Sequence, residues 1–108
     1  MFAVIYRWKL IPGLEGQFEE GWRAGTAVIV KEFGGWGSRL HRGDDGTVFA
    51  YAQWPDRATW ERAMATRMRH SDDAARARYL GAFEPESFET IFAGEVVADL
   101  LELRRGSA

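Results

Sequence analysis

Cysteine is absent from this chain of 108 residues, so disulfides, thiolate nucleophiles and zinc–sulfur sites are excluded. Imidazole is scarce too: His41 and His70 are the two histidines, and they are not at a helical ligand spacing, so we predict no metal site. An excess of positive charge is also lacking, because 14 basic residues face 16 acidic ones. Proteins that bind nucleic acid through its phosphates normally carry a concentrated basic surface, so we expect no nucleic-acid partner.

Long apolar runs are missing as well. No stretch approaches the roughly 20 apolar residues of a membrane-spanning helix. Arg7 and Lys9 interrupt the apolar amino terminus, which therefore does not read as a signal peptide. We expect no membrane partner and a cytoplasmic location. With 46% apolar and 28% charged residues, the chain is typical of one globular domain, which we place at residues 1–103, followed by a tail at 104–108.

Aromatic residues are abundant, at 14% of the chain. They can form a core of large side chains, or they can line a pocket for a flat, apolar ligand. Two aromatic-rich segments, Phe2–Lys9 and Thr47–Trp54, are apolar on both of their alternating faces. An antiparallel strand with one wet face should instead alternate apolar and polar residues. The helices of so short a chain can cover only one face of a sheet, so we predict that a second copy covers the other.

The remaining segments predict the other elements. Apolar residues recur at helical spacing from Leu14 to Phe33, which indicates an amphipathic helix of about five turns. Gly35–Arg42 reads as a strand that forms a hairpin with Thr47–Trp54 across the turn at 43–46. Asp56 is a good N-cap for a second helix. The inner face of that helix is predicted to carry Trp60, Ala63, Met64 and Met68.

A short third helix is expected to follow Ser71, and Glu95–Glu102 is expected to be the last strand. We interpret Phe88–Phe92, between them, as a loop or a single turn. The predicted order is β-α-β-β-α-(α)-β. This is the α+β, ferredoxin-like βαββαβ arrangement, an antiparallel four-stranded sheet with helices on one face.

At this point the chain resembles the antibiotic biosynthesis monooxygenase (ABM) family of dimeric α+β barrels. The resemblance rests on the Pro12-Gly13 turn after the first strand, on Gln53-Trp54-Pro55, on Trp60, and on the segment from Glu95 to Leu100. It covers nearly the whole chain. It implies a homodimer in which two sheets pack face to face, which agrees with the strands that are apolar on both faces.

The resemblance also implies a chemistry. Family members with established activity use molecular oxygen without flavin, metal or nicotinamide, so no cofactor is expected. Their substrate is an electron-rich phenol, anthrone or hydroquinone, and the protein supplies an apolar pocket, one or two polar groups and exclusion of water. The leading hypothesis is therefore a cofactor-independent monooxygenase that acts on a small aromatic or polyketide-like molecule. The alternative is a dimeric ligand-binding or stress-related module without catalysis, and a third is a purely structural dimer.

The family has a haem-degrading branch, whose members carry an Asn on the first strand, a Trp on the second helix and a His about ten residues further on. In this sequence the Asn position falls on Tyr6, the Trp position near Ala63 and the His position near Asp73. Trp60 and His70 have the right mutual spacing, but each lies three residues too early. Haem degradation is therefore disfavoured.

Three residues are candidates for catalysis. Tyr6 is either a core tyrosine or a phenol donor or acceptor in the pocket. His41 is either a general base or a partly exposed histidine near the hairpin. Arg39 alternates with His41 on one face and is either an anion-stabilising group or a solvated arginine.

Four further residues are candidates for substrate binding: Trp22, Trp36, Trp60 and His70. Trp22 and Trp60 are expected mainly in the core, with a ring edge toward a cavity. Trp36, between glycines, fits a pocket lid or the dimer interface. His70 is expected at the end of the second helix, where its cation would suit the helix dipole. Asp99, on an apolar segment, is expected to pair with Arg7 or Lys9 or to be exposed at the barrel rim.

Overall fold

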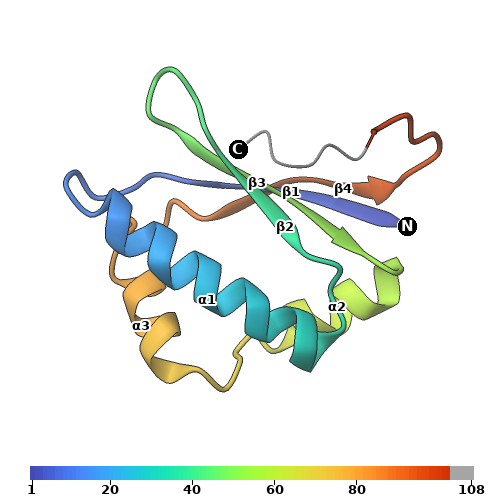
Figure 1. The fold of residues 1–108 in the computed structure, drawn as a ribbon, viewed down its shortest axis with the longest axis horizontal. Coiled ribbons are helices and arrows are strands. Elements are labelled where there is room, and N and C mark those ends of the chain that lie inside the picture. The colour runs from blue at the N-terminus through green and yellow to red at the C-terminus, as the bar shows by residue number, and fades with distance from the viewer. Residues whose placement is uncertain (103–108) are drawn as a thin grey trace.

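A sheet of four strands and a layer of three helices make up residues 1–102, the part of the chain that this computed structural model describes (Figure 1). The elements are, in order, β1 (Phe2–Trp8), α1 (Glu15–Phe33), β2 (Ser38–Arg42), β3 (Val48–Trp54), α2 (Arg57–Ala65), α3 (Asp73–Leu80) and β4 (Glu89–Glu95). The strand order in the sheet is β2-β3-β1-β4, with every neighbouring pair antiparallel. The predicted α+β, ferredoxin-like fold is confirmed, and the predicted tail at 104–108 lies outside the described residues.

Local chemistry explains where the helices begin and end. Gly34 adopts a left-handed conformation, with φ at 77°, and ends α1. Asp56 accepts a hydrogen bond from the backbone N–H of Thr59 at 2.8 Å, so the predicted N-cap of α2 is confirmed. Asp72 caps α3 in the same way, through the N–H of Ala75 at 3.0 Å. No helix within residues 1–102 is long and apolar enough to cross a membrane.

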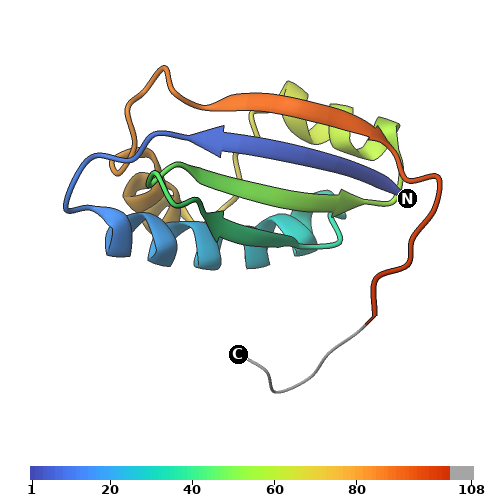
Figure 2. The same cartoon turned by 90° about the horizontal axis from the view of Figure 1, so that it is seen from above.

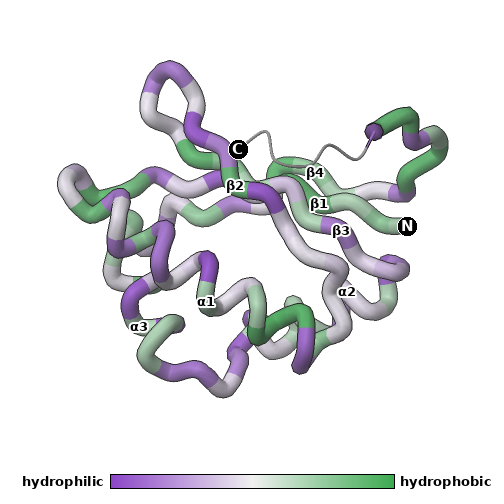
Figure 3. The backbone as a smooth tube through the Cα atoms, in the orientation of Figure 1, coloured by the Kyte–Doolittle hydropathy of each residue, from purple (hydrophilic) through white to green (hydrophobic). Residues whose placement is uncertain are grey.

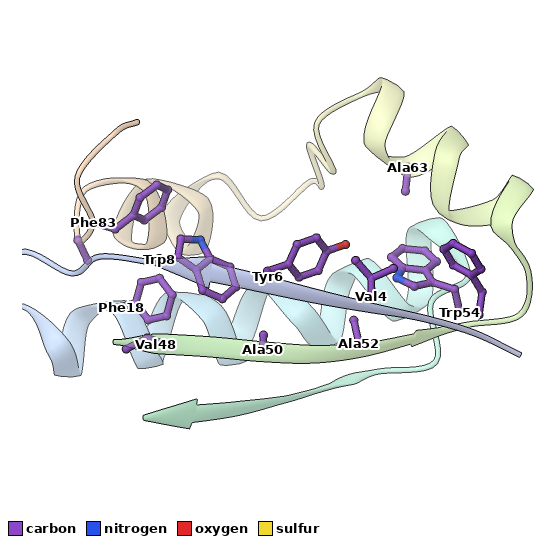
Figure 4. Packing of buried hydrophobic residues seen from close by; sticks show 12 residues of the cluster. Val4, Tyr6, Trp8, Phe18, Val48, Ala50, Ala52, Trp54, Ala63 and Phe83 are labelled. Carbon is purple, nitrogen blue, oxygen red and sulfur yellow. The ribbon is translucent and has the colours of Figure 1, made fainter. Parts of the chain in front are cut away.

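The core lies between the sheet and the helices. Alternate residues of β1 and β3 face the helices, and all of these are buried: Phe2, Val4, Tyr6 and Trp8 on β1, and Val48, Ala50, Ala52 and Trp54 on β3. Figure 4 shows these side chains projecting from the two strands toward the helical layer. Phe18 from α1 and Phe83, which follows α3, complete the cluster. The inner face of the sheet is thus occupied by this chain's own side chains.

The outer face of the sheet has no helix over it, as Figures 1 and 2 show. The register places Ile5 opposite Tyr51 on β3 and opposite Phe92 on β4, so apolar residues line this face across three strands. Phe92 is 55% exposed. The prediction that the helices cover only one face is therefore confirmed for the single chain.

The last strand was placed wrongly by the sequence reading. β4 spans Glu89–Glu95 and so includes most of Phe88–Phe92, for which a loop or turn is predicted, whereas residues 96–102 of the predicted strand Glu95–Glu102 are not in a strand. A register shift between Ile5 and Tyr6 on β1 marks an irregularity in the pairing with β4, and it breaks the period of two by which strands are recognised. Residues 96–102 extend from the sheet after β4, and the apolar residues among them are green in Figure 3. Val97 there is 95% exposed.

Smaller corrections concern element ends. β2 begins at Ser38 rather than at Gly35, and α2 ends at Ala65, so Met68 lies beyond the helix to which it was assigned. Asp99 is exposed and accepts a hydrogen bond from the N–H of Leu101 at 3.0 Å. Exposure was one of its two expected settings. The other predicted setting, an ion pair of Asp99 with Arg7 or Lys9, is not found, because Arg7 pairs with Glu89 and Lys9 pairs with Glu84.

Candidate functional site

A cavity of about 610 Å³ lies between the inner face of the sheet and the helices. Its walls are mostly apolar and rich in rings, which come from β1, β3, α1 and α3 and from the segments after α3. Six of these ring residues are Tyr6, Trp8, Trp22, Trp54, Tyr79 and Phe83. Its size is within the range of small-molecule sites. Such walls suit a flat, apolar ring system.

Two tyrosine hydroxyls lie in this cavity wall, and each accepts a hydrogen bond from an indole. Trp60 Nε1 donates to the hydroxyl of Tyr6 at 2.8 Å, and Trp8 Nε1 donates to the hydroxyl of Tyr79 at 2.8 Å. Burial raises the pKa of both phenols, that of Tyr79 to about 12, because a buried phenolate would lose its hydration. Both groups are therefore protonated at neutral pH, and each keeps a hydrogen that it can donate.

Trp54 supplies a third polar hydrogen. Its side chain is buried, and its Nε1–H is the one side-chain polar atom in residues 1–102 that has neither accessible surface nor a hydrogen-bond partner. An orphaned buried donor costs about 1–3 kcal/mol. The ring lies close enough to Tyr6 to lower that residue's pKa, against the stronger effect of burial. Because this nitrogen has almost no accessible surface, a ligand in the cavity cannot reach it.

His70 contributes a fourth polar group. It lies in the connection between α2 and α3 and is only 6% exposed. Its Nδ1 accepts a hydrogen bond from the backbone N–H of Asp72 at 3.2 Å. A backbone amide can only donate, so Nδ1 carries no proton, and the neutral ring must carry its proton on Nε2. His70 thus offers a hydrogen, not a lone pair, on its cavity side.

The ring of His70 packs against α1 at a glycine. A Cβ at Gly25 would be 2.9 Å from Nε2 of His70, so the imidazole occupies space that an alanine would take. One turn earlier, a Cβ at Gly21 would be 2.6 Å from the backbone N of Tyr79. These two glycines let α3 and the preceding connection approach α1 closely. This close packing explains why α1 contains glycine, a residue of low helix propensity, at these two positions.

The connection that carries His70 is strained. Arg67 and Met68 both adopt left-handed backbone conformations, with φ of 55° and 49°. Each such non-glycine residue costs roughly 1–2 kcal/mol, and this kind of strain is concentrated at functional sites. Both residues line the cavity. Glu32 of α1 anchors the connection by accepting hydrogen bonds from the backbone N–H and the hydroxyl of Ser71.

The charges around the cavity have one sign. Arg67 and Arg76 belong to its lining, and among the described residues that line it there is no Asp or Glu. His70, the two phenols and the arginines therefore all offer hydrogens, while the side-chain oxygens of Thr26, Ser38 and Gln53 in the lining can also accept them. An electropositive, donor-rich cavity favours a ligand that brings oxygen acceptors.

The structure places three of the predicted site residues, Tyr6, Trp22 and His70, in the lining of this cavity. Trp60 lies behind Tyr6, as the donor to its hydroxyl. Figure 4 shows Tyr6 on the inner face between Trp8 and Trp54. Catalysis and ligand binding by these side chains stay predictions.

The other predicted residues lie elsewhere. Arg39 and His41 are exposed on β2 and line a separate depression of about 360 Å³. They are paired in register with Tyr51 and Phe49. Trp36 is 57% exposed and is not among the residues that line the larger cavity. The structure thus does not bring Arg39, His41 and Tyr6 together in one cavity, and their catalytic roles remain untested.

Sequence reasoning missed the contributions of Tyr79, Trp54 and Arg67 to the cavity. The helical spacing of Ala75, Tyr79 and Phe83 was visible, but it reads equally well as packing. Nothing in the local pattern marks Arg67, because its place depends on the left-handed turn after α2. The expected position of His70 at a helix end was wrong, since α2 ends five residues earlier, at Ala65.

The site does not fit a haem-degrading enzyme. An axial histidine binds iron through the lone pair of an unprotonated ring nitrogen. In His70 that lone pair is on Nδ1, where the backbone N–H of Asp72 occupies it. Tyr6 stands where the haem-degrading pattern has Asn. The structure thus argues against haem degradation, as the sequence does.

Solved structures of other proteins share this fold. SnoaB from Streptomyces nogalater, a cofactor-independent oxygenase, is similar with a TM-score of 0.68 and 16% identity, over 94% of this chain and 97% of SnoaB. Rv0793 from Mycobacterium tuberculosis has a TM-score of 0.65 and 14% identity, over 93% of this chain and 98% of its own. A proposed antibiotic biosynthesis monooxygenase from Bacteroides thetaiotaomicron has a TM-score of 0.63 and 12% identity, over 95% of each chain.

No protein-family model matches the chain, and no curated protein matches its sequence. The likeness is thus one of structure, and fold alone does not carry an activity from one protein to another. The similarity nevertheless covers nearly the whole length of each chain. This chain therefore has the fold of the antibiotic biosynthesis monooxygenases, as the resemblance of its sequence predicted.

Proposed function

We propose that this protein is a cofactor-independent monooxygenase that oxidises a small aromatic or polyketide-like substrate with molecular oxygen. The observation that carries the proposal is the cavity of about 610 Å³ between sheet and helices, walled by aromatic rings and equipped with buried hydrogen-bond donors. The shared fold with SnoaB, a cofactor-independent oxygenase, supports it. The reaction belongs in this cavity because apolar walls exclude water from a reactive intermediate.

The proposed reaction converts a CH₂ group flanked by aromatic rings into a carbonyl. The substrate loses a proton and becomes an electron-rich anion that reduces O₂. One oxygen atom of O₂ enters the new C=O bond, and the other leaves as water with the two hydrogens of the CH₂ group. Tyr6, protonated because burial raises its pKa, donates a hydrogen bond to the substrate's oxyanion. Trp60 holds the Tyr6 hydroxyl in place from behind.

We also propose that the protein works as a homodimer, joined through the outer face of the sheet. Phe92 on that face is 55% exposed, and Val97 and Leu100 beyond β4 are 95% and 94% exposed. A monomer gains nothing from such an apolar surface, whereas a second copy would remove it from water. The location in the cytoplasm stays a prediction.

A second candidate is a non-catalytic module that binds a small aromatic ligand. It is favoured by one observation: no carboxylate lies among the described lining residues, and the two phenols of the cavity are held in their protonated form. A substrate would then find donors but no ready proton acceptor. Arg39 and His41, the other predicted catalytic residues, lie in the separate depression on β2.

Oxygen consumption separates the two candidates. The purified protein is supplied with a panel of anthrones and hydroquinones, and O₂ uptake is compared with that of Tyr6→Phe and His41→Ala. An oxygenase should consume O₂ in proportion to enzyme, and Tyr6→Phe should slow it by about a hundredfold or more, the usual loss when one donor to a transition-state oxyanion is removed. Saturable quenching of tryptophan fluorescence without O₂ uptake would instead establish the binding module.

A further inference from the structure

His70 stands out because it is buried and polar, yet it has only one of its two ring nitrogens satisfied. Nδ1 accepts the Asp72 N–H at 3.2 Å, and Nε2, which must carry the proton, lies against Gly25, where both residues belong to the cavity lining. No hydrogen-bond partner for Nε2 exists within residues 1–102. A protonated, uncommitted nitrogen in a cavity wall is a site for an acceptor atom.

Other polar hydrogens of the wall converge on the same kind of partner. The hydroxyls of Tyr6 and Tyr79 use their oxygens to accept from indoles, and no acceptor for their own hydrogens is found within residues 1–102. Arg67 and Arg76 add positive charge, and no acidic side chain of the described lining offsets it. The wall is thus complementary to oxygen atoms, above all to anionic ones.

We infer that His70 binds the ligand by donating its Nε2–H to an oxygen, and that the cavity selects flat aromatic molecules bearing carbonyl, phenolate or carboxylate oxygens. This inference rests on the proposed function for the cavity and names the ligand class that fits it. His70 acts here as a fixed donor, not as a base, since its lone pair is held by the backbone of Asp72.

The setting of His70 favours a fixed donor. Before His70, Arg67 and Met68 adopt left-handed conformations. Immediately after His70, Ser71 donates hydrogen bonds to the carboxylate of Glu32. The imidazole is wedged against Gly25 on α1. A side chain fixed from both sides presents its donor at little entropic cost on binding.

Binding of matched naphthalene derivatives tests the inference by isothermal titration calorimetry, without oxygen so that no turnover occurs. The probes are naphthoate, an anion with oxygen acceptors, methylnaphthalene, which has no polar group, and naphthylmethylammonium, a cation that can only donate. We expect naphthoate to bind at least tenfold more tightly than the ammonium compound. Equal affinities for these two probes would overturn the ligand class.

His70→Phe keeps a flat ring and removes the donor. It should weaken naphthoate binding by about ten- to a hundredfold, the loss of a hydrogen bond to a charged group, and leave methylnaphthalene binding within about twofold. His70→Gln, which can place an amide N–H near the position of Nε2, should recover part of the loss. If His70→Phe binds naphthoate as the unaltered protein does, the assignment of His70 is wrong.

Gly25→Ala provides a second route should the His70 variants fold poorly. Its methyl group would displace Nε2 of His70 while the histidine itself remains, so the same selective loss of naphthoate affinity is expected. Arg69→Gln is the matched control, since Arg69 lies in the same connection and carries a charge but does not line the cavity. A loss of naphthoate affinity in Arg69→Gln equal to that in His70→Phe would contradict a specific role for His70.

The binding assay and the oxygen assay distinguish failure of this inference from failure of the proposed oxygenase function. Naphthoate binding that depends on His70, together with no O₂ uptake from any aromatic substrate, would sink the oxygenase and support this inference. O₂ uptake that His70→Phe leaves unchanged, in both KM and kcat, would support the oxygenase and sink this inference.

Discussion

The two faces of the sheet share the strands β1 and β3, yet they meet different surroundings. On the inner face, Val4, Tyr6 and Trp54 are buried under the helices, and Tyr6 and Trp54 line a cavity. On the outer face, Ile5 and Tyr51 are half-buried and Phe92 is 55% exposed, with no helix above them. Both faces are apolar, but only the inner one is covered by this chain.

The difference indicates two roles for the apolar surface of the sheet: the inner face encloses a cavity, and the outer face is free to pack against a partner. Inner residues are large and interlock through Trp–Tyr hydrogen bonds, which leave a defined space for a small molecule. Outer residues make no Trp–Tyr hydrogen bond within residues 1–102, although Gln53 donates to the hydroxyl of Tyr51, and they fit a partner surface, which we propose to be a second copy. If this division is right, changes on one face should alter stability or ligand binding, and changes on the other should alter association.

Gly21→Ala should have the largest effect on the inner side. Its methyl group would lie 2.6 Å from the backbone N of Tyr79, and two backbones cannot both yield. We expect the free energy of unfolding, from urea denaturation, to fall by about 3 kcal/mol, at the upper end for overpacking. Gly16→Ala is the matched control on the same helix, because nothing lies within 4 Å of its Cβ position. That variant should gain about 0.5–1 kcal/mol from helix propensity, and an equal loss in both variants would refute the close-packing account.

Phe92→Glu should affect the outer face alone. A charge at the centre of a proposed two-fold interface would be buried without a partner, so the dimer dissociation constant should rise by about a hundredfold or more. Sedimentation velocity across a micromolar concentration series measures it. Ala24→Glu adds the same charge on an exposed position of α1 and should leave association unchanged. A Phe92→Glu protein that associates like the unaltered one would show that this face is not the interface.

Alkaline pH should weaken the inner side through its buried phenols. Burial raises the pKa of Tyr79 from its ordinary 10.0 to about 12, so the folded chain keeps a proton that the unfolded chain loses. This contribution is complete below about pH 10 and is lost as the pH rises toward 12. Between about pH 9 and pH 11, the free energy of unfolding should drop by roughly 1–3 kcal/mol, with Tyr6 shifting in the same direction. Tyr79→Phe should flatten this slope, and an unchanged slope would contradict the assignment.

Tyr6→Phe should have the smallest effect on stability. It removes the acceptor of the Trp60 indole and leaves that N–H beside the orphaned Trp54 N–H. We expect a loss of about 1–2 kcal/mol in the free energy of unfolding, measured by urea denaturation. Phe49→Leu on the outer side of β3 keeps an apolar side chain and breaks no hydrogen bond, so it should cost less. A larger loss in Phe49→Leu would reverse the proposed contrast between the faces.

The fold was largely predictable because its signals are local or periodic. The cap at Asp56, the long amphipathic segment before Gly34 and the apolar strands each leave a pattern in neighbouring residues. β4 was missed because a register shift in its pairing with β1, next to Ile5, interrupts the alternation of side chains along β4. The segment 96–102, which is mostly apolar, has instead a pattern that is typical of a strand. Apolar character alone does not tell pairing within a chain from an unpaired surface.

The candidate site was less predictable, since its chemistry depends on which atoms are left over after folding. Tyr6 could be named from its place on β1, but its indole partner Trp60 is 54 positions away. The tautomer of His70 depends on the backbone N–H of Asp72, and its reach into the cavity depends on Gly25. These relations arise only when α1, α2 and α3 have packed, so no spacing in the sequence encodes them.

The central claim is that a flat, oxygen-bearing ligand occupies the inner side of the sheet and a second copy the outer side. A crystal structure with naphthoate bound tests both parts at once. The account predicts the naphthalene ring between Tyr6 and Trp22 with a carboxylate oxygen within hydrogen-bond distance of His70 Nε2, and a partner sheet packed over Phe92. Naphthoate bound against Phe92 on the outer face, with the inner cavity empty, would contradict it.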